Sequence, residues 1–229
     1  MGFKLDGMTF QAPVRTRAIL FVPASPAVVA QLAPKDPAGE LLRAAVRQAR
    51  ELVGEVSTVA LWVREEAHTY TRHTGRFRAW GDPHTDVGAG NHLPELVARY
   101  LVQQVGWGSK IVQGHAGVVG SSDVDLLVLP IDGSLGLTPR APLALVPGAH
   151  DVHRDMISLL NGTSSPQWTA ETLRAAGVPE DTNLDFWLEV AALPTSAREH
   201  AHLLLADATL GVGRFVALWQ FSEPVEVPA

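Results

Sequence analysis

The stretch that decides the fold is residues 124–134, VDLLVLPIDGS. Its first eight positions are nearly all apolar. A strand that helices cover on both faces has such a run, because neither of its faces meets water. The stretch therefore predicts a central strand at residues 124–131, buried between two layers of helices.

Two further apolar runs precede this strand, at residues 17–23 (RAILFVP) and 56–63 (VSTVALWV). Both are short and bounded by helix-breaking residues, which favours strands. Between them, Asp36-Pro37 is typical of a helix start and Gly54 of a helix end. This order predicts a parallel strand–helix–strand unit. The polar connection after it is expected to hold a short strand at residues 76–80.

The rest of the chain alternates helical and extended patterns. Helices are expected at residues 94–105, 150–160, 169–176 and 182–193, and a short strand at residues 110–113. A short helical turn near Ser196 is followed by two apolar runs around Gly211-Val212-Gly213, which predict a C-terminal β-hairpin. The expected fold is α/β, with a central, mostly parallel sheet flanked by helices.

The chain has no internal repeat and no Ser/Gly-rich linker, which predicts a single domain over residues 1–229. Residues 1–16 are interpreted as an N-terminal extension and residues 222–229 as a C-terminal tail. No stretch reaches the ~18 consecutive apolar residues that a membrane-spanning helix needs. The expected location is the cytoplasm, with no membrane partner.

Composition excludes several classes of protein. The 24 acidic and 18 basic side chains give a net charge of −6, which argues against a nucleic-acid partner, since such partners require a basic surface. Cysteine is absent, and with it disulfides, thiolate nucleophiles and cysteine-ligated metal sites. Nine histidines remain as the candidates for metal chemistry.

The segment Asp132-Gly133-Ser134 follows the central strand, at the end of the sheet where open α/β folds place their sites. Asp132 and Ser134 are therefore candidate site residues, although an ordinary Asp-Gly turn explains the segment equally well. Ser25 follows the first strand and His68 lies shortly after the second. The nucleophile elbow, the dinucleotide fingerprint and the phosphate loop are all missing from the sequence.

Most of the histidines have structural explanations. His150 and His153 are spaced to share one face of a helix, where a solvated surface is the expected environment. His200 and His202 share a face only in an extended segment, and a half-exposed strand accounts for them.

Six motifs in this order resemble a known family: ILFVPASP, TGRFRAWG, LPELVARYL, LLVLPIDGS, LEVAAL and LLLADATLGVGRFVALW. The set is similar to the class III extradiol ring-cleavage dioxygenase superfamily, in particular to a small actinobacterial branch distantly similar to Memo-like proteins. The resemblance extends from about Ala18 to Trp219. It implies an α/β fold and, in active members, an iron(II) ion held by two histidines and a glutamate.

The sequence departs from the family at the first iron ligand. That histidine normally follows the proline at the end of the first strand, and the corresponding segment is Val22-Pro23-Ala24-Ser25-Pro26. A methyl group cannot replace an imidazole, and a site of two histidines and one carboxylate loses most of its affinity without one ligand. The resemblance with Ala24 therefore implies a vestigial metal site without bound metal or cofactor, and no ring-cleaving activity.

Three functions follow as hypotheses. In the first, the old cleft, lined by Ser25, His68, Asp132 and Ser134, binds a small molecule or a protein partner. In the second, the chain is a ring-cleavage dioxygenase or another metalloenzyme, in which His68, His92 and His115 with Asp132 hold Fe(II) or another divalent metal in a relocated site. In the third, the chain is a non-enzymatic interaction protein that forms homo-oligomers through an apolar edge.

Overall fold

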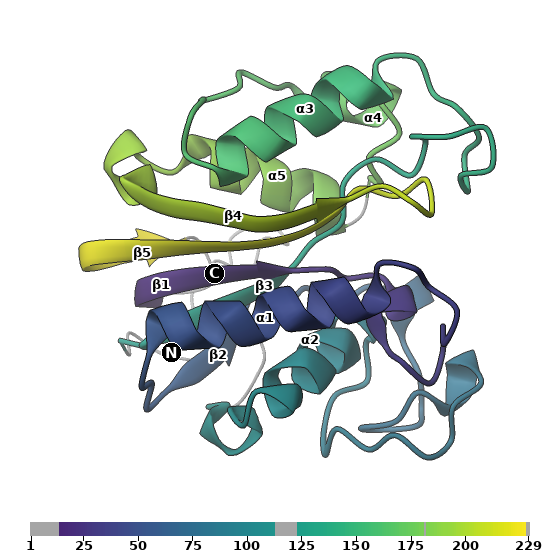
Figure 1. Ribbon diagram of the computed structural model, residues 1–229, viewed down its shortest axis with the longest axis vertical. Helices are drawn as coiled ribbons and strands as arrows, with labels where there is room; N and C mark the ends of the chain where they lie inside the picture. Colours follow the sequence, from purple (N-terminus) through teal and green to yellow (C-terminus); the bar gives the residue numbers. More distant parts are fainter. Residues whose placement is uncertain (1–13, 113–122, 181, 228–229) are drawn as a thin grey trace, which may run out of the picture.

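Helices cover both faces of a five-stranded sheet in the computed structural model, which describes residues 14–112, 123–180 and 182–227 (Figure 1). The strand order across the sheet is β2-β3-β1-β5-β4. The strands are β1 (Val14–Val22), β2 (Val59–Leu61), β3 (Leu126–Pro130), β4 (His200–Asp207) and β5 (Arg214–Val227). The α/β class expected from the sequence is confirmed.

The sheet is mixed, so the expectation of a mostly parallel sheet is wrong. β3 pairs in parallel with both β1 and β2, whereas β5 pairs antiparallel with both β1 and β4. The predicted C-terminal hairpin is present as β4 and β5, but it does not lie apart from the sheet. β5 runs the whole length of β1, from the pair Val14–Val227 to the pair Phe21–Ala217. Its apolar first half therefore completes the core beside β1.

The helices form two layers, one on each side of the sheet (Figure 1). α1 (Gly39–Val53) and α2 (Leu93–Gln104) cover one face. α3 (Ala149–Leu160), α4 (Ala170–Ala175) and α5 (Thr182–Ala192) cover the other. All five residues of β3 are buried, as the continuous apolar run predicted for a central strand.

The packing of α1 shows how local sequence builds these layers. Leu42, Ala45, Val46 and Ala49 recur at helical spacing and are buried against the sheet. Gly54 ends the helix with φ +75° and ψ −143°, a positive-φ conformation that glycine adopts without steric cost.

Three local predictions differ from the structure. Residues 76–80, expected as a strand, end in a single 3-10 turn at Arg78–Trp80. Residues 110–113, expected as a strand, contribute one bridge between Ile111 and Val59 within the described part. Asp36 is not the N-cap of α1, which begins three residues later with Ala38 as its N-cap. The Asp36 carboxylate accepts a hydrogen bond from the Ala38 N–H and pairs with the distant Arg214.

The strands reach further toward both ends of the chain than expected. Residues 14–16 belong to β1, and residues 222–227 belong to β5. Of the helices in the described ranges, none is long and apolar enough to cross a membrane.

Candidate functional site

A cleft of about 320 Å³ opens where the parallel strands β1 and β3 end. Its floor comes from the segments directly after these strands, Ala24–Pro26 after β1 and Asp132 after β3. The carboxyl ends of parallel strands are where open α/β sheets bind ligands, because the following loops diverge there and leave a crevice. The structure therefore has a cleft at the end of the sheet where the sequence predicts site residues.

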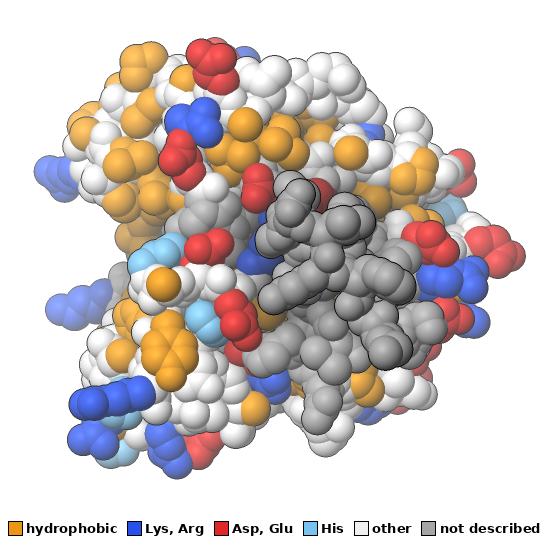
Figure 2. Space-filling model, turned by 180° about the vertical axis from the view of Figure 1, so that it is seen from behind, with side chains coloured by type: hydrophobic (Ala, Val, Ile, Leu, Met, Phe, Trp, Pro, Cys, Tyr) orange, Lys and Arg blue, Asp and Glu red, His pale blue; other side chains and the backbone are white. Residues whose placement is uncertain are grey.

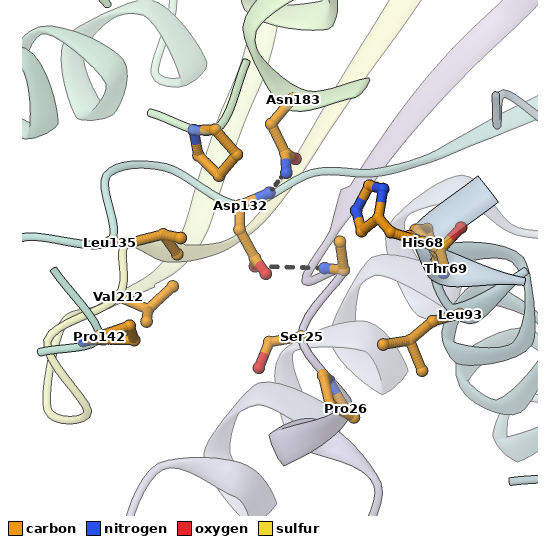
Figure 3. A pocket seen from close by; sticks show the side chains of 13 residues that line it. Ser25, Pro26, His68, Thr69, Leu93, Asp132, Leu135, Pro142, Asn183 and Val212 are labelled. Carbon is orange, nitrogen blue, oxygen red and sulfur yellow. Dashed lines mark hydrogen bonds between the residues drawn. The ribbon is translucent and has the colours of Figure 1, made fainter. Parts of the chain in front are cut away.

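Asp132 is the central polar residue of this cleft (Figure 3). Its side chain is 6% exposed, and its Oδ1 accepts a hydrogen bond of 3.2 Å from the backbone N–H of Ala24. Its own backbone is fixed on both sides. The N–H donates to Oδ1 of Asn183 at 2.9 Å, and the carbonyl accepts from Nε1 of Trp187 at 2.9 Å. Asp132 is thus held rigidly at the floor of the cleft.

Burial raises the pKa of Asp132 to about 7. Hydrogen bonds from the backbone N–H groups of Ala24 and Ser25, together with the charge of Arg214, oppose this shift without cancelling it. The carboxyl group therefore exchanges its proton near neutral pH, where an ordinary aspartic acid is fully ionised.

Arg214, the cation whose charge acts on Asp132, forms its hydrogen bonds with two other carboxylates. It is 0% exposed, and its Nε donates to Oδ2 of Asp207 at 2.9 Å while its Nη2 donates to Oδ1 of Asp36 at 3.0 Å. Burial acts to raise the pKa of Asp36, but hydrogen bonds from Arg214 and from the Ala38 N–H hold it below its ordinary value. Arg214, Asp36 and Asp207 thus form a buried ion triad beneath the cleft.

The walls of the cleft are mostly apolar. Leu135, Pro142 and Val212 lie on one side of Asp132, and His68, Thr69 and Leu93 lie on the other (Figure 3). On the face shown in Figure 2, the outline of the molecule is indented at the left, and histidine and acidic side chains lie there beside apolar ones. Among the described residues that line the cleft, none is lysine or arginine.

Of the four side chains expected in the cleft, three line it: Ser25, His68 and Asp132. Ser134 does not, so the prediction that it lines the cleft is wrong. Its side chain is 0% exposed, and its hydroxyl donates to the carbonyl of Ala176 at 2.6 Å and accepts from the N–H of Gly136 at 3.0 Å. Ser134 therefore stabilises the loop behind the cleft.

The relocated metal site finds little support in the geometry. His92 is buried outside the cleft lining, with Nδ1 3.1 Å from the hydroxyl of Thr69 and 3.2 Å from the carbonyl of Glu66. His115 lies outside the described residues. In the part of the chain that the structure describes, no group of three or more His, Asp or Glu side chains is placed to hold a metal ion.

The other histidine pairs have different environments. His150 is exposed, but His153 is partly buried, with its ring 5.2 Å from that of Phe215. Burial, followed by the nearby charge of His150, lowers the pKa of His153. The expectation of a solvated face is thus wrong for this one residue. His200 and His202 are exposed on β4, as expected for a half-exposed strand.

The sequence interpretation missed Asn183, Leu93 and Val212, which belong to the starts of α5 and α2 and to the turn before β5. No sequence motif indicates these three residues, because they come from separate segments that only the fold brings together. Arg214 did carry a signal. An arginine at the head of an apolar run (RFVALW) that forms a buried strand needs a buried carboxylate partner.

Comparisons with known proteins add no identification. No protein-family model matches the sequence, and a search of the curated proteins finds no match.

The arrangement has a definite chemical capability. The Asp132 carboxyl group donates a hydrogen bond when protonated and accepts one when ionised, and both forms are populated near neutral pH. Apolar walls beside such a group make its surroundings less polar, which strengthens its interactions with a bound molecule. The site is therefore suited to hold a small molecule by one polar end.

Proposed function

We propose that this chain binds a small organic molecule in the cleft, with Asp132 as the polar contact. The observation that carries the proposal is the position of Asp132: a buried carboxyl group, fixed by backbone hydrogen bonds, at the floor of a cleft with apolar walls. Burying an ionisable group without a charged partner costs folding free energy. A ligand that hydrogen-bonds to the carboxyl group offsets this cost.

The proposal includes the family suggested by the ordered motifs. The chain is then a class III extradiol dioxygenase-like protein whose iron site has been lost. The α/β fold is consistent with this assignment. Ala24, which stands at the position of the first iron ligand in that resemblance, lines the same cleft and is 8% exposed.

The residues at this position do not fit an iron ion. The Ala24 side chain is a methyl group, and its backbone N–H is used by Asp132. His68 is the one histidine among the described residues that line the cleft, and iron sites of this type need two. A binding function is therefore favoured over ring cleavage.

Ligand-observed NMR with a library of small fragments tests the binding function. Leu93 lines the cleft, so Leu93→Trp fills it, while Leu52→Trp places the same bulk on the exposed surface of α1, where Leu52 is 46% exposed. Fragments that bind wild type and Leu52→Trp but not Leu93→Trp support the proposal. Fragments that bind all three proteins equally contradict it.

Metal analysis of the purified protein tests the lost iron site. The expected result for wild type is less than stoichiometric iron, manganese or zinc. The metal content of His68→Ala should be the same as that of wild type. Stoichiometric metal that disappears in His68→Ala would instead establish a working metal site and overturn this part of the proposal.

A further inference from the structure

The chemical class of the ligand follows from the balance of charge around the cleft, and this step rests on the proposed function. Three carboxyl groups, those of Asp36, Asp132 and Asp207, surround a single guanidinium, that of Arg214. With all three carboxyl groups ionised, the cluster has a formal charge of −2. The N–H groups of Arg214 donate hydrogen bonds to Asp36 and Asp207. Asp132 is therefore the carboxyl group of the three that has no ion pair with Arg214.

The partners of Asp132 in the described structure are neutral. Its carboxylate accepts from backbone N–H groups, and none of the ion pairs among described residues includes it. A buried carboxylate that is bonded only to neutral donors remains unfavourable, because hydrogen bonds offset only part of the lost hydration of a charge. A positive charge placed in the cleft would supply the missing interaction.

Among the described residues of the cleft, no side chain with a permanent positive charge is present to bind an anion. The described lining contains no lysine or arginine, and its ionisable side chains are Asp132 and His68. The helices that begin at the cleft, α2 and α5, have positively polarised N-terminal ends. Each already carries a carboxylate in its first turn, Glu95 in α2 and Asp185 in α5, which offsets that polarity.

From this geometry we infer that the cleft binds a protonated amine attached to an apolar body, with the ammonium group on Asp132 and the body against the apolar walls. Leu93, Leu135 and Val212 supply the apolar contact on the two sides of the carboxyl group. A charge-assisted hydrogen bond inside an apolar cleft is stronger than a neutral one, so a cationic ligand gains more than an alcohol of the same shape.

Three probes of one shape and different charge test this inference: benzylamine, benzyl alcohol and benzoate. Their affinities for wild type are measured at pH 8 by NMR titration. The expected order is benzylamine tighter than benzyl alcohol by about tenfold, and benzoate weakest. Asp132→Asn keeps the shape and the hydrogen-bond acceptor but removes the charge, so it should reduce the affinity for benzylamine about tenfold and leave that for benzyl alcohol nearly unchanged.

The pH dependence of the affinity of wild type for benzylamine is a second measurement. The ammonium group competes with a proton for Asp132, so the affinity for benzylamine should rise about tenfold from pH 6 to pH 8. Among the described residues, the charged and titratable groups that face Asp132 are Arg214 from β5, with Asp36 and Asp207 behind it, and His68 across the cleft. His68→Gln should retain the step, because Asp132 is the group that titrates.

The outcomes separate this inference from the binding function itself. If benzyl alcohol or benzoate binds as tightly as benzylamine, and Leu93→Trp abolishes that binding, the cleft is a binding site but the preference for amines is overturned. Equal affinity of benzylamine for wild type and Asp132→Asn also overturns it. If none of the probes binds wild type in a manner sensitive to Leu93→Trp, the binding function fails together with the inference.

Discussion

The backbone N–H of Ala24 donates a hydrogen bond of 3.2 Å to the Oδ1 of Asp132, which joins the segments that follow the two parallel strands β1 and β3. The residues are 108 positions apart in the chain. The bond fixes the buried carboxyl group at the floor of the cleft. It also occupies the backbone at the position where the sequence resemblance places an iron ligand.

The first prediction concerns the pH dependence of stability. The pKa of Asp132 is raised from 3.8 to about 7 on folding. The folded state therefore binds more protons than the unfolded state between these values, and the contribution of this group to stability falls as pH rises through that window. Asp132→Asn should gain about 2 kcal/mol of unfolding free energy relative to wild type between pH 5.5 and pH 8.5.

Urea unfolding of both proteins at the two pH values measures this difference. The other carboxyl groups are the same in both proteins, so their contributions to the pH dependence of stability cancel in the difference between the two unfolding free energies. A constant difference between the proteins would show that Asp132 does not titrate in this range.

The second prediction concerns the buried ion triad. Replacing Arg214 by leucine leaves the carboxylates of Asp36 and Asp207 buried without a cation, which should cost about 3–5 kcal/mol of unfolding free energy. The matched control is Arg47→Leu, which removes a surface ion pair to Glu40. It should leave the urea midpoint nearly unchanged, because exposed pairs contribute little. Similar losses in the two variants would contradict the role assigned to the triad.

The third prediction compares two buried tryptophans. Both Trp187 and Trp62 pack edge-on against a phenylalanine, at 5.6 Å from Phe215 and 5.4 Å from Phe186 respectively. Trp187 Nε1 donates to the Asp132 carbonyl, whereas Trp62 Nε1 is buried with no hydrogen-bond partner among the described residues. Trp187→Phe should therefore destabilise the fold by about 1–2 kcal/mol more than Trp62→Phe.

Chemical denaturation of the two variants measures the difference directly, since both substitutions remove the same atoms. If Trp62→Phe proves the more costly, the hydrogen bond to Asp132 contributes less than its geometry indicates.

The fourth prediction concerns the turn of the C-terminal hairpin. Gly211 has φ +77°, and a Cβ there would lie 2.8 Å from Cα of Ala141 in the neighbouring loop. Gly148, directly before α3, also has φ +77°, with open space around it. Gly148→Ala should lower the free energy of unfolding by about 1 kcal/mol through backbone strain alone. Gly211→Ala should cost at least twice as much, because the loop beside the cleft must move. Equal midpoints in thermal melts of the two variants would contradict the contact.

The sequence predicted those elements whose signals are local. The apolar run at residues 124–131 identified β3, and the spacing at residues 94–105 identified α2 to within one residue at each end. The hairpin was predicted because two apolar runs flank a glycine turn. In each case the residues that form the element also carry its pattern.

Pairings between distant segments were not predictable in this way. The antiparallel pairing of β5 with β1 made the sheet mixed, and an apolar run has the same appearance whichever neighbour it pairs with. The Asp36-Pro37 pattern predicts a helix cap, and nothing near Asp36 in the sequence indicates its ion-pair partner Arg214, which lies 178 residues away. The proximity of Ser134 to Asp132 in the sequence predicts that it lines the cleft, but the loop turns its hydroxyl inward, to the carbonyl of Ala176.

The most direct test of the central claim, that small molecules bind at Asp132, is to map the site by amide NMR. Benzylamine is titrated into ¹⁵N-labelled wild type at pH 8, and the shifts of every amide are followed. The account predicts the largest changes at the N–H groups of Ala24 and Ser25, which donate to the Asp132 carboxylate, and their loss in Leu93→Trp. Saturable shifts elsewhere, with Ala24 and Ser25 unmoved, would contradict it.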